Sequence, residues 1–312
     1  MNRLYRLTGI VLVVTATIYF LSYLVKNWEL LPTEIFELQM VPTFIATTLC
    51  YLSCFLLTSK AWYRLLHYFG ETPRFLPILS ITLLSQFAKY LPGNFAHHIG
   101  RIMLASNEGI SKRSIATTLI FELILVILAA GTSGLIAVAF TKSLLFSDFL
   151  GVPSPDQVSA LSVVIVLIFL LFCLSLPSIK NTIIKSSKDN VFYIKPLYHL
   201  LVCYLYYITN FLLLGAILYL LTDAQFSQVK PDYWLLTGLF SIAWIVGFIT
   251  PGAPAGLGVR EAILIMALDP IYGSAVALSL TITLRIITTL GDGLGFLIGL
   301  SMRRCLKYDS KA

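Results

Sequence analysis

The chain has 312 residues, of which 58% are hydrophobic and 12% are charged, whereas soluble proteins average about 45–50% apolar and about 25% charged residues. This composition excludes an ordinary soluble domain and predicts an all-α integral membrane protein. The net charge of +7 does not indicate a nucleic-acid partner, because such binding needs an exposed basic face, and we attribute it to basic loops beside apolar spans.

Apolar runs long enough to cross a bilayer recur along the chain, since a spanning helix needs about 20 residues. The first run follows Arg3 and Arg6 as a signal sequence would, but it has no small-residue cleavage site. We therefore expect it to stay as an anchor. The six predicted spans are 7–25, 40–59, 114–140, 157–179, 196–222 and 270–302.

Two further apolar stretches, 75–104 and 233–268, are each interrupted by a segment rich in proline and glycine. Proline removes a backbone donor and clashes with the preceding turn, while glycine accepts left-handed backbone angles, so together they can end a helix. We predict a broken-helix hairpin at each. The interruptions read Leu91-Pro92-Gly93-Asn94 and Pro251-Gly252-Ala253-Pro254-Ala255-Gly256-Leu257-Gly258.

The distribution of Lys and Arg separates two topologies. If both hairpins return to the side they enter, six spans place fifteen Lys and Arg inside and three outside, whereas eight spans place eleven inside and seven outside. The positive-inside rule favours six spans with two re-entrant hairpins. We therefore expect both termini to be cytoplasmic, in the inner (cytoplasmic) membrane of a bacterium or archaeon. The Lys and Arg count is equally compatible with hairpin arms that turn back midway and with arms that cross the membrane fully.

An internal repeat divides the chain. Arg101 follows Pro92 by nine residues and Arg260 follows Pro251 by nine, an offset of 159 in a chain whose half-length is 156. With three spans per half, the second half is inverted, as in many alternating-access transporters. We predict one membrane domain with halves 1–156 and 157–302 and a cytoplasmic tail, 303–312. The alternative is a chance likeness between two Pro-Gly breaks.

Both breaks are expected to face an internal cavity, because irregular backbone at membrane depth is tolerated only inside protein or beside water. A new helix begins after each break, and its free N–H groups and positive dipole end attract anions. Arg101 and Arg260 add planar donor pairs that match phosphate. We interpret them as two phosphate clamps, one in each half.

Four ionisable residues lie inside apolar spans and are functional candidates, because burying charge in a membrane is costly: Glu122, Glu261, Arg285 and Asp292. The alternative is internal pairing that holds the fold, for instance Glu261 with Arg285 or Glu122 with Arg101. Glu261 also suits the first turn of its helix, where a carboxylate stabilises the dipole.

Other polar residues near the first break have simpler interpretations. Lys89 is expected to extend along its helix to the membrane interface. His97 and His98 lie in the break, where they could couple transport to protons or serve as hydrogen-bonding residues. The segment 59–69 combines aromatic and basic residues, as expected of a helix lying in the inner interface.

These considerations give one predicted substrate site. Its residues are Pro92, Gly93, Asn94, His97, His98, Arg101, Glu122, Pro251, Gly252, Gly256, Gly258, Arg260, Glu261 and Arg285. We predict no catalytic residue, no metal ion and no cofactor.

The segments 91–101 and 251–262 resemble the two signature segments of the flippase-like domain family, the transmembrane region of lysylphosphatidylglycerol synthases. The resemblance covers about residues 7–302 and implies lipid translocation, with Arg101, Arg260 and Glu122 at matching positions. Only about ten residues follow Met302, so we expect a stand-alone member without lysyl transfer. His97-His98 stands where many members have Gly-Asp, which leaves the head group open.

Two candidate functions are compatible with these features, and in both the protein binds a membrane lipid. The leading one is a flippase for an anionic phospholipid, an aminoacylated lipid or a polyprenyl-phosphate-linked glycan. The alternative is a glycosyltransferase-like membrane enzyme with a lipid-linked donor, which needs a general base and often a metal-binding acidic pair; the sequence has no Asp-x-Asp cluster. An accessory subunit or scaffold would leave the buried charges unexplained. We therefore expect a transporter rather than an enzyme.

Overall fold

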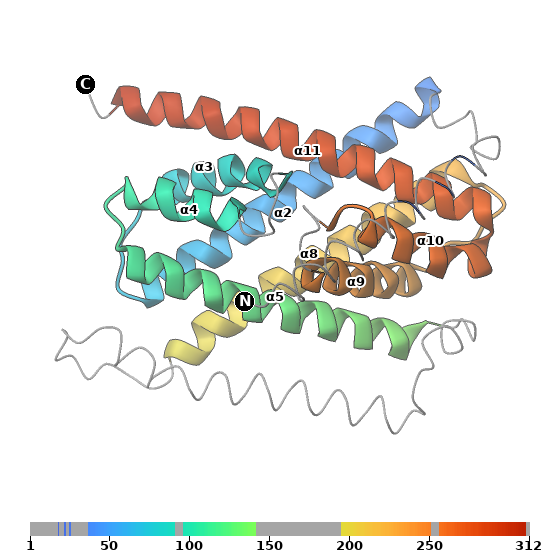
Figure 1. The fold of residues 1–312 in the computed structure, drawn as a ribbon, viewed down its shortest axis with the longest axis horizontal. Coiled ribbons are helices and arrows are strands. Elements are labelled where there is room, and N and C mark those ends of the chain that lie inside the picture. Colours follow the sequence, from blue (N-terminus) through green and yellow to red (C-terminus); the bar gives the residue numbers. More distant parts are fainter. Residues whose placement is uncertain are drawn as a thin grey trace.

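The computed structural model describes residues 37–90, 96–141, 195–250 and 256–309, with the isolated residues 18, 22 and 25. The described elements are all helical, which confirms the predicted all-α class (Figure 1). Apart from the isolated residues, the predicted spans 7–25 and 157–179 lie outside the described residues. The elements are η3 (Leu38–Met40), α2 (Val41–Tyr68), α3 (Phe75–Gln86), η4 (Phe87–Tyr90), α4 (Ala96–Ser106), α5 (Lys112–Phe140), α8 (Lys195–Gln225), α9 (Tyr233–Ile249), α10 (Val259–Tyr272) and α11 (Ser274–Asp309).

Among the described helices, four are long and apolar enough to cross a membrane: Leu38–Tyr68, Lys112–Val138, Tyr198–Gln225 and Ser274–Leu306. They coincide with four of the six predicted spans. Their length is sufficient because a helix rises about 1.5 Å per residue and the apolar core of a bilayer is about 30 Å thick.

The predicted start of the last span at Pro270 is wrong. Pro270 lies inside α10, near its end, and the chain turns at Gly273 before α11 begins at Ser274. Gly273 has φ 84°, a left-handed conformation that glycine adopts at little cost. The apolar run continues through this turn, so hydropathy alone cannot place it.

We predicted that the segment 59–69 forms a helix lying in the inner interface. This prediction is wrong, because most of the segment is the end of α2. Trp62 and Leu66 are fully buried, and they pack in one cluster with Ile78 of α3 and Ile115 of α5. Neighbouring helices cover the face of this segment that carries Trp62 and Leu66, whereas Lys60 and His67 on other faces are exposed.

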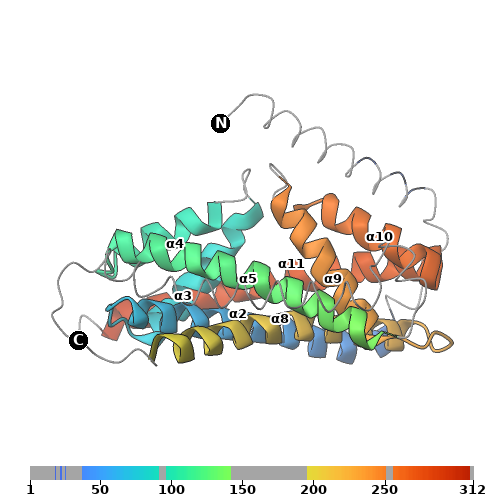
Figure 2. The same ribbon diagram turned by 90° about the horizontal axis from the view of Figure 1, so that it is seen from below.

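The two interrupted stretches form two helix pairs. The first helix pair is α3 with η4 and α4, and the second is α9 and α10; within each, the two helices pack against each other. The pairs lie toward opposite ends of the long axis of the molecule (Figure 2). Helices on both sides of each break are as predicted, while the break residues 91–95 and 251–255 lie outside the described part.

Long helices hold the two pairs together. Helix α11 packs against α3 of the first pair and α10 of the second, α5 packs against α9, and α2 packs against α8. Two contacts depend on glycine: a Cβ atom at Gly215 of α8 would lie 1.9 Å from Thr237 Oγ1 of α9, and one at Gly291 of α11 would lie 2.4 Å from Tyr51 Cδ1 of α2. Small residues permit this close approach, a frequent basis of helix association in membranes.

Candidate functional site

A cavity of about 240 Å³ is lined by residues of both helix pairs. The first pair contributes Gln86, Lys89, Tyr90, His97, His98 and Arg101, and the second contributes Phe240, Trp244, Gly247, Phe248, Gly256 and Arg260. Helices α2, α5, α8 and α11 complete the walls. The described residues beside both breaks therefore line one cavity, while residues 91–95 and 251–255, which belong to the breaks that we predict to face it, lie outside the described part.

In the first pair, Arg101 forms a buried ion pair with Glu122 of α5. Arg101 lies in the second turn of α4 and is 1% exposed. Its Nη1 donates to both carboxylate oxygens of Glu122, at 2.7 Å each. The predicted alternative of internal pairing is thus confirmed for this arginine, whose charge is largely neutralised within the protein.

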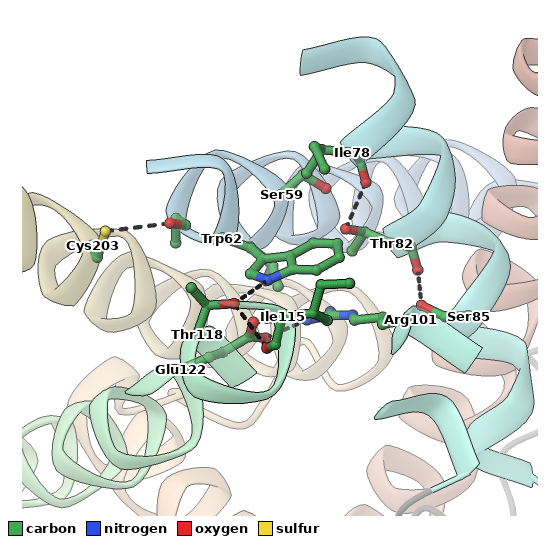
Figure 3. A network of polar contacts seen from close by, with 12 residues as sticks. Ser59, Trp62, Ile78, Thr82, Ser85, Arg101, Ile115, Thr118, Glu122 and Cys203 are labelled. Atoms are coloured by element: carbon green, nitrogen blue, oxygen red, sulfur yellow. Dashed lines mark hydrogen bonds and ion pairs between the residues drawn. The ribbon is translucent and has the colours of Figure 1, made fainter. Parts of the chain in front are cut away.

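Trp62 and Thr118 complete the surroundings of Arg101 (Figure 3). The guanidinium carbon lies 5.1 Å from the centre of the Trp62 ring, a distance at which a cation and an aromatic face attract. Trp62 Nε1 donates to Thr118 Oγ1 at 3.0 Å, and Thr118 donates to the Ile115 carbonyl at 2.9 Å. These contacts fix Arg101 between α2, α4 and α5.

In the second pair, Arg260 is the second residue of α10 and lines the cavity. Its Nε is buried and has no hydrogen-bond partner, and Arg260 forms no ion pair with an acid among the described residues. A Cβ at Gly256 would lie 3.4 Å from both Nε and Nη2 of Arg260, and one at Gly247 would lie 3.6 Å from Nε. These are ordinary contact distances, so both glycines lie directly beside the guanidinium, and the left-handed φ of 71° at Gly256 is the conformation that favours glycine there.

The carboxylate of Glu261, the residue after Arg260, contacts Gly258 and Arg285 and forms no ion pair with Arg260. Its Oε2 accepts the backbone N–H of Gly258 at 2.8 Å, which confirms the prediction that it stabilises the first turn of its helix. Its Oε1 lies 3.3 Å from Arg285 Nη1 of α11, so the predicted alternative of pairing is confirmed here too. The Arg285 guanidinium carbon also lies 5.5 Å from the centre of the Tyr90 ring.

The prediction that Lys89 extends to the membrane interface is wrong. Its Nζ lies 2.7 Å from Asp292 Oδ2 of α11 and also donates to Tyr51 Oη at 3.1 Å. Asp292 is fully buried and accepts hydrogen bonds from Tyr51 at 2.9 Å and from Tyr90. A buried carboxylate needs such partners. Lys89 therefore pairs with the nearby Asp292 inside the protein and does not extend to the membrane interface.

His97 and His98 lie in the first turn of α4, so the prediction that they belong to the break itself is wrong. Their ring centres are 3.9 Å apart. Both rings line the cavity, and both Nδ1 atoms are buried without a hydrogen-bond partner. They can therefore contribute to binding a polar group in the cavity.

The structure brings together most of the predicted site residues that it describes. Those that line the cavity are His97, His98, Arg101, Glu122, Gly256, Arg260 and Arg285. Gly258 and Glu261 are bonded to each other at the start of α10. Pro92, Gly93, Asn94, Pro251 and Gly252 lie outside the described residues.

Sequence reasoning missed part of the lining. Tyr207 and Asn210 of α8 and Trp244 of α9 face the same cavity. Asn210 lies within the predicted span 196–222, and a polar amide inside an apolar run was a usable signal. Tyr207 and Trp244 gave none, because aromatic residues are common in buried helices.

One of the cationic side chains that line the cavity has no acidic partner among the described residues. Of its four cationic side chains, Lys89, Arg101 and Arg285 pair with acids, which are Asp292, Glu122 and Glu261. Within the described residues, Arg260 is the cation of the cavity without an acidic partner. The break segments 91–95 and 251–255 carry no ionisable side chain. The described part of the cavity thus carries one positive charge that no described acid balances.

Residues 7–294 match the family model described as Lysylphosphatidylglycerol synthase TM region. No curated relative matches the chain. The match to a transmembrane region agrees with the four long apolar helices and identifies a multi-pass membrane protein. Because the matched residues include nearly the whole chain, the protein belongs to the family of lysylphosphatidylglycerol synthase transmembrane regions.

Proposed function

We propose that the protein moves a lipid with an anionic phosphate head group between the two leaflets of the inner membrane. Arg260 carries the proposal, because it lines the cavity, its Nε is buried without a hydrogen-bond partner, and no acid among the described residues pairs with it. A guanidinium can donate two parallel hydrogen bonds to a phosphate. Arg101 then supports the cavity wall instead of acting as the second clamp.

The dimensions of the cavity support the passage of a head group alone. Its volume of about 240 Å³ is below the roughly 300–1,000 Å³ of pockets that enclose drug-sized ligands. In the proposed mechanism the phosphate and its substituent enter the cavity, and the acyl or polyprenyl chains stay in the membrane.

The proposal includes six spans and two re-entrant hairpins arranged as an inverted repeat, with both termini cytoplasmic. The positions of the two helix pairs toward opposite ends of the molecule support it (Figure 2). In such an arrangement each hairpin opens the shared cavity to one side of the membrane in turn.

A lipid-flipping assay in proteoliposomes tests the proposal. We expect the wild-type protein to move fluorescent phospholipids between leaflets and Arg260→Gln to lower the rate roughly ten- to a hundredfold, because hydrogen bonds to charged groups contribute about 1.5–3 kcal/mol. The matched control is Arg304→Gln, which removes an exposed arginine near the end of α11. Wild-type rates equal to those of protein-free vesicles would overturn the proposal.

Lipid mass spectrometry on the same vesicles separates a transporter from a transferase. We expect no new lipid species when a polyprenyl-phosphate-linked sugar is supplied as donor. A glycosylated product that forms with the wild type and is lost with Arg260→Gln would establish the enzyme instead.

A further inference from the structure

One wall of the cavity combines aromatic faces with polar atoms that lack partners. Tyr207, Asn210 and Phe211 occupy one face of α8, and Trp244 and Phe248 occupy one face of α9. The rings of Phe211 and Trp244 meet edge to face at 5.4 Å, and those of Trp244 and Phe248 stack at 5.1 Å. The ion pairs described above do not involve this wall.

Two polar atoms of this wall, one of Tyr207 and one of Asn210, are buried and have no hydrogen-bond partner. Tyr207 is 2% exposed, and its hydroxyl has no hydrogen-bond partner. The Asn210 Oδ1 atom has none either, although its Nδ2 donates to Thr58 Oγ1 at 3.0 Å, which fixes the side chain. Buried polar atoms nearly always have partners in folded proteins, so two such atoms beside one cavity point to hydroxyl groups of a ligand.

The aromatic rings point to the same chemistry. The face of an aromatic ring carries partial negative charge, which attracts the weakly positive C–H groups on the face of a sugar or cyclitol ring. An ammonium group would also be attracted to the rings, but four cations line the cavity and only three of them pair with a described acid. The charge balance therefore favours an uncharged hydroxylated group over an amine.

We propose that the cavity contains a second subsite, formed by Tyr207, Asn210 and Trp244, for an uncharged polyhydroxyl group that is esterified to the phosphate bound by Arg260. This inference rests on the proposed function, since it names the head group of the same lipid. Inositol phospholipids and sugar-phosphate polyprenols share this chemistry, and aminoacylated lipids do not.

Binding measurements on the purified full-length protein in detergent micelles test the subsite. The probes are phosphatidylinositol and glucosyl-phosphoryl-polyprenol as the two hydroxylated sources, phosphatidylethanolamine as the amine, and phosphatidic acid as the lipid without a substituent. We expect at least one hydroxylated lipid to bind about fivefold or more tightly than the other two, as one or two added hydrogen bonds would give. Which hydroxylated lipid binds identifies its source.

Three variants assign the preference to this wall. Tyr207→Phe removes one hydroxyl and keeps the ring, and Asn210→Ala removes the amide; each should lower affinity for the hydroxylated lipid severalfold and leave phosphatidic acid unchanged. Trp234→Leu is the matched control, since Trp234 stacks on Phe140 and is absent from the cavity lining. It should change neither affinity.

The outcomes separate this inference from the proposed function. Equal binding of all four lipids, or preference for the amine, overturns the polyhydroxyl subsite, as does an unchanged preference in both Tyr207→Phe and Asn210→Ala. If binding of every phospholipid still falls with Arg260→Gln, the proposed phosphate site stands without the subsite. If Arg260→Gln changes no affinity, both proposals fail.

Discussion

Arg101 and Arg260 occupy the same place in two similar sequence segments, nine residues after a Pro-Gly break, yet the structure surrounds them differently. Arg101 lies under Trp62 and bonds to both oxygens of Glu122. Arg260 lies beside Gly247 and Gly256 with no described acid in contact. Equal spacing from a helix break thus places an arginine at the cavity without deciding whether its charge is used by the fold or left for a ligand.

The position of the nearest acid explains the difference. Glu122 belongs to another helix, α5, and faces Arg101 directly. Glu261 adjoins Arg260 in sequence, but successive side chains on a helix diverge by about 100°, and this carboxylate bonds to Gly258 and Arg285 instead. A neighbour in sequence therefore neutralises less charge here than a neighbour across helices.

The largest effect is expected from breaking the first ion pair. Glu122→Ala leaves the Arg101 cation buried without its acid, so we expect the free energy of unfolding to fall by about 3–5 kcal/mol. Unfolding of the purified protein in detergent measures this. Glu108→Ala, which removes a partly exposed carboxylate 3.7 Å from Arg303, should cost less than about 1 kcal/mol. Similar losses for both variants would contradict a buried, structural role for Glu122.

A smaller effect is expected from two glycines at helix contacts. One contact is between α8 and α9 of the second pair, and the other is between α4 and α3 of the first pair. Gly215→Ala places a methyl group 1.9 Å from Thr237 Oγ1 of α9, and relieving this overlap should cost about 1–3 kcal/mol. Gly100→Ala in the first pair meets only Ser85, with its Cβ at 3.5 Å and its Cα at 3.8 Å, which are ordinary contacts. There we expect no loss, and a gain of up to about 1 kcal/mol from helix propensity. The two melting temperatures measure the contrast, and equal values would contradict it.

The next effect isolates the surroundings of Arg101. Trp62→Phe removes the hydrogen bond to Thr118 but keeps an aromatic ring beside the guanidinium. We expect a loss of about 1–2 kcal/mol, because one hydrogen bond is removed and the smaller ring leaves part of a fully buried site unfilled. Denaturation curves measure it. Thr118→Val removes the acceptor and also the hydrogen bond that Thr118 donates to the Ile115 carbonyl. The double variant should lose less than the sum of the two single losses, because the Trp62–Thr118 bond is common to both changes.

The smallest effect on stability is expected at Arg260. Arg260→Gln removes a partly buried cation that makes no ion pair with a described acid, so the free energy of unfolding should not fall, because a buried charge without a partner does not stabilise the fold. Arg101→Gln leaves Glu122 without its cation and should lower the free energy of unfolding. Detergent unfolding of the two variants compares them directly, and a large loss with Arg260→Gln would make that arginine structural as well.

Some of the site was accessible to sequence reasoning because it rests on local rules. Proline and glycine mark the ends of α9 and the start of α10, and Glu261 three residues after Gly258 marks the first turn of a helix. Lys89 was misplaced because its partner, Asp292, lies 203 residues further along the chain. No local rule relates residues at that separation, although each was visible as an ionisable group in an apolar run.

The sequence by itself determined that this chain is helical and belongs in a membrane, where the long apolar runs lie, and that two of them are broken beside an arginine. These features depend on composition and on the backbone preferences of nearby residues. Only the tertiary structure decided which charges pair, that the described flanks of both breaks share one cavity, and that Arg260 keeps its charge free of a described acid. The attraction between two charged side chains weakens with distance, so ion pairs depend on which helices contact each other. Hydropathy carries no information about those contacts.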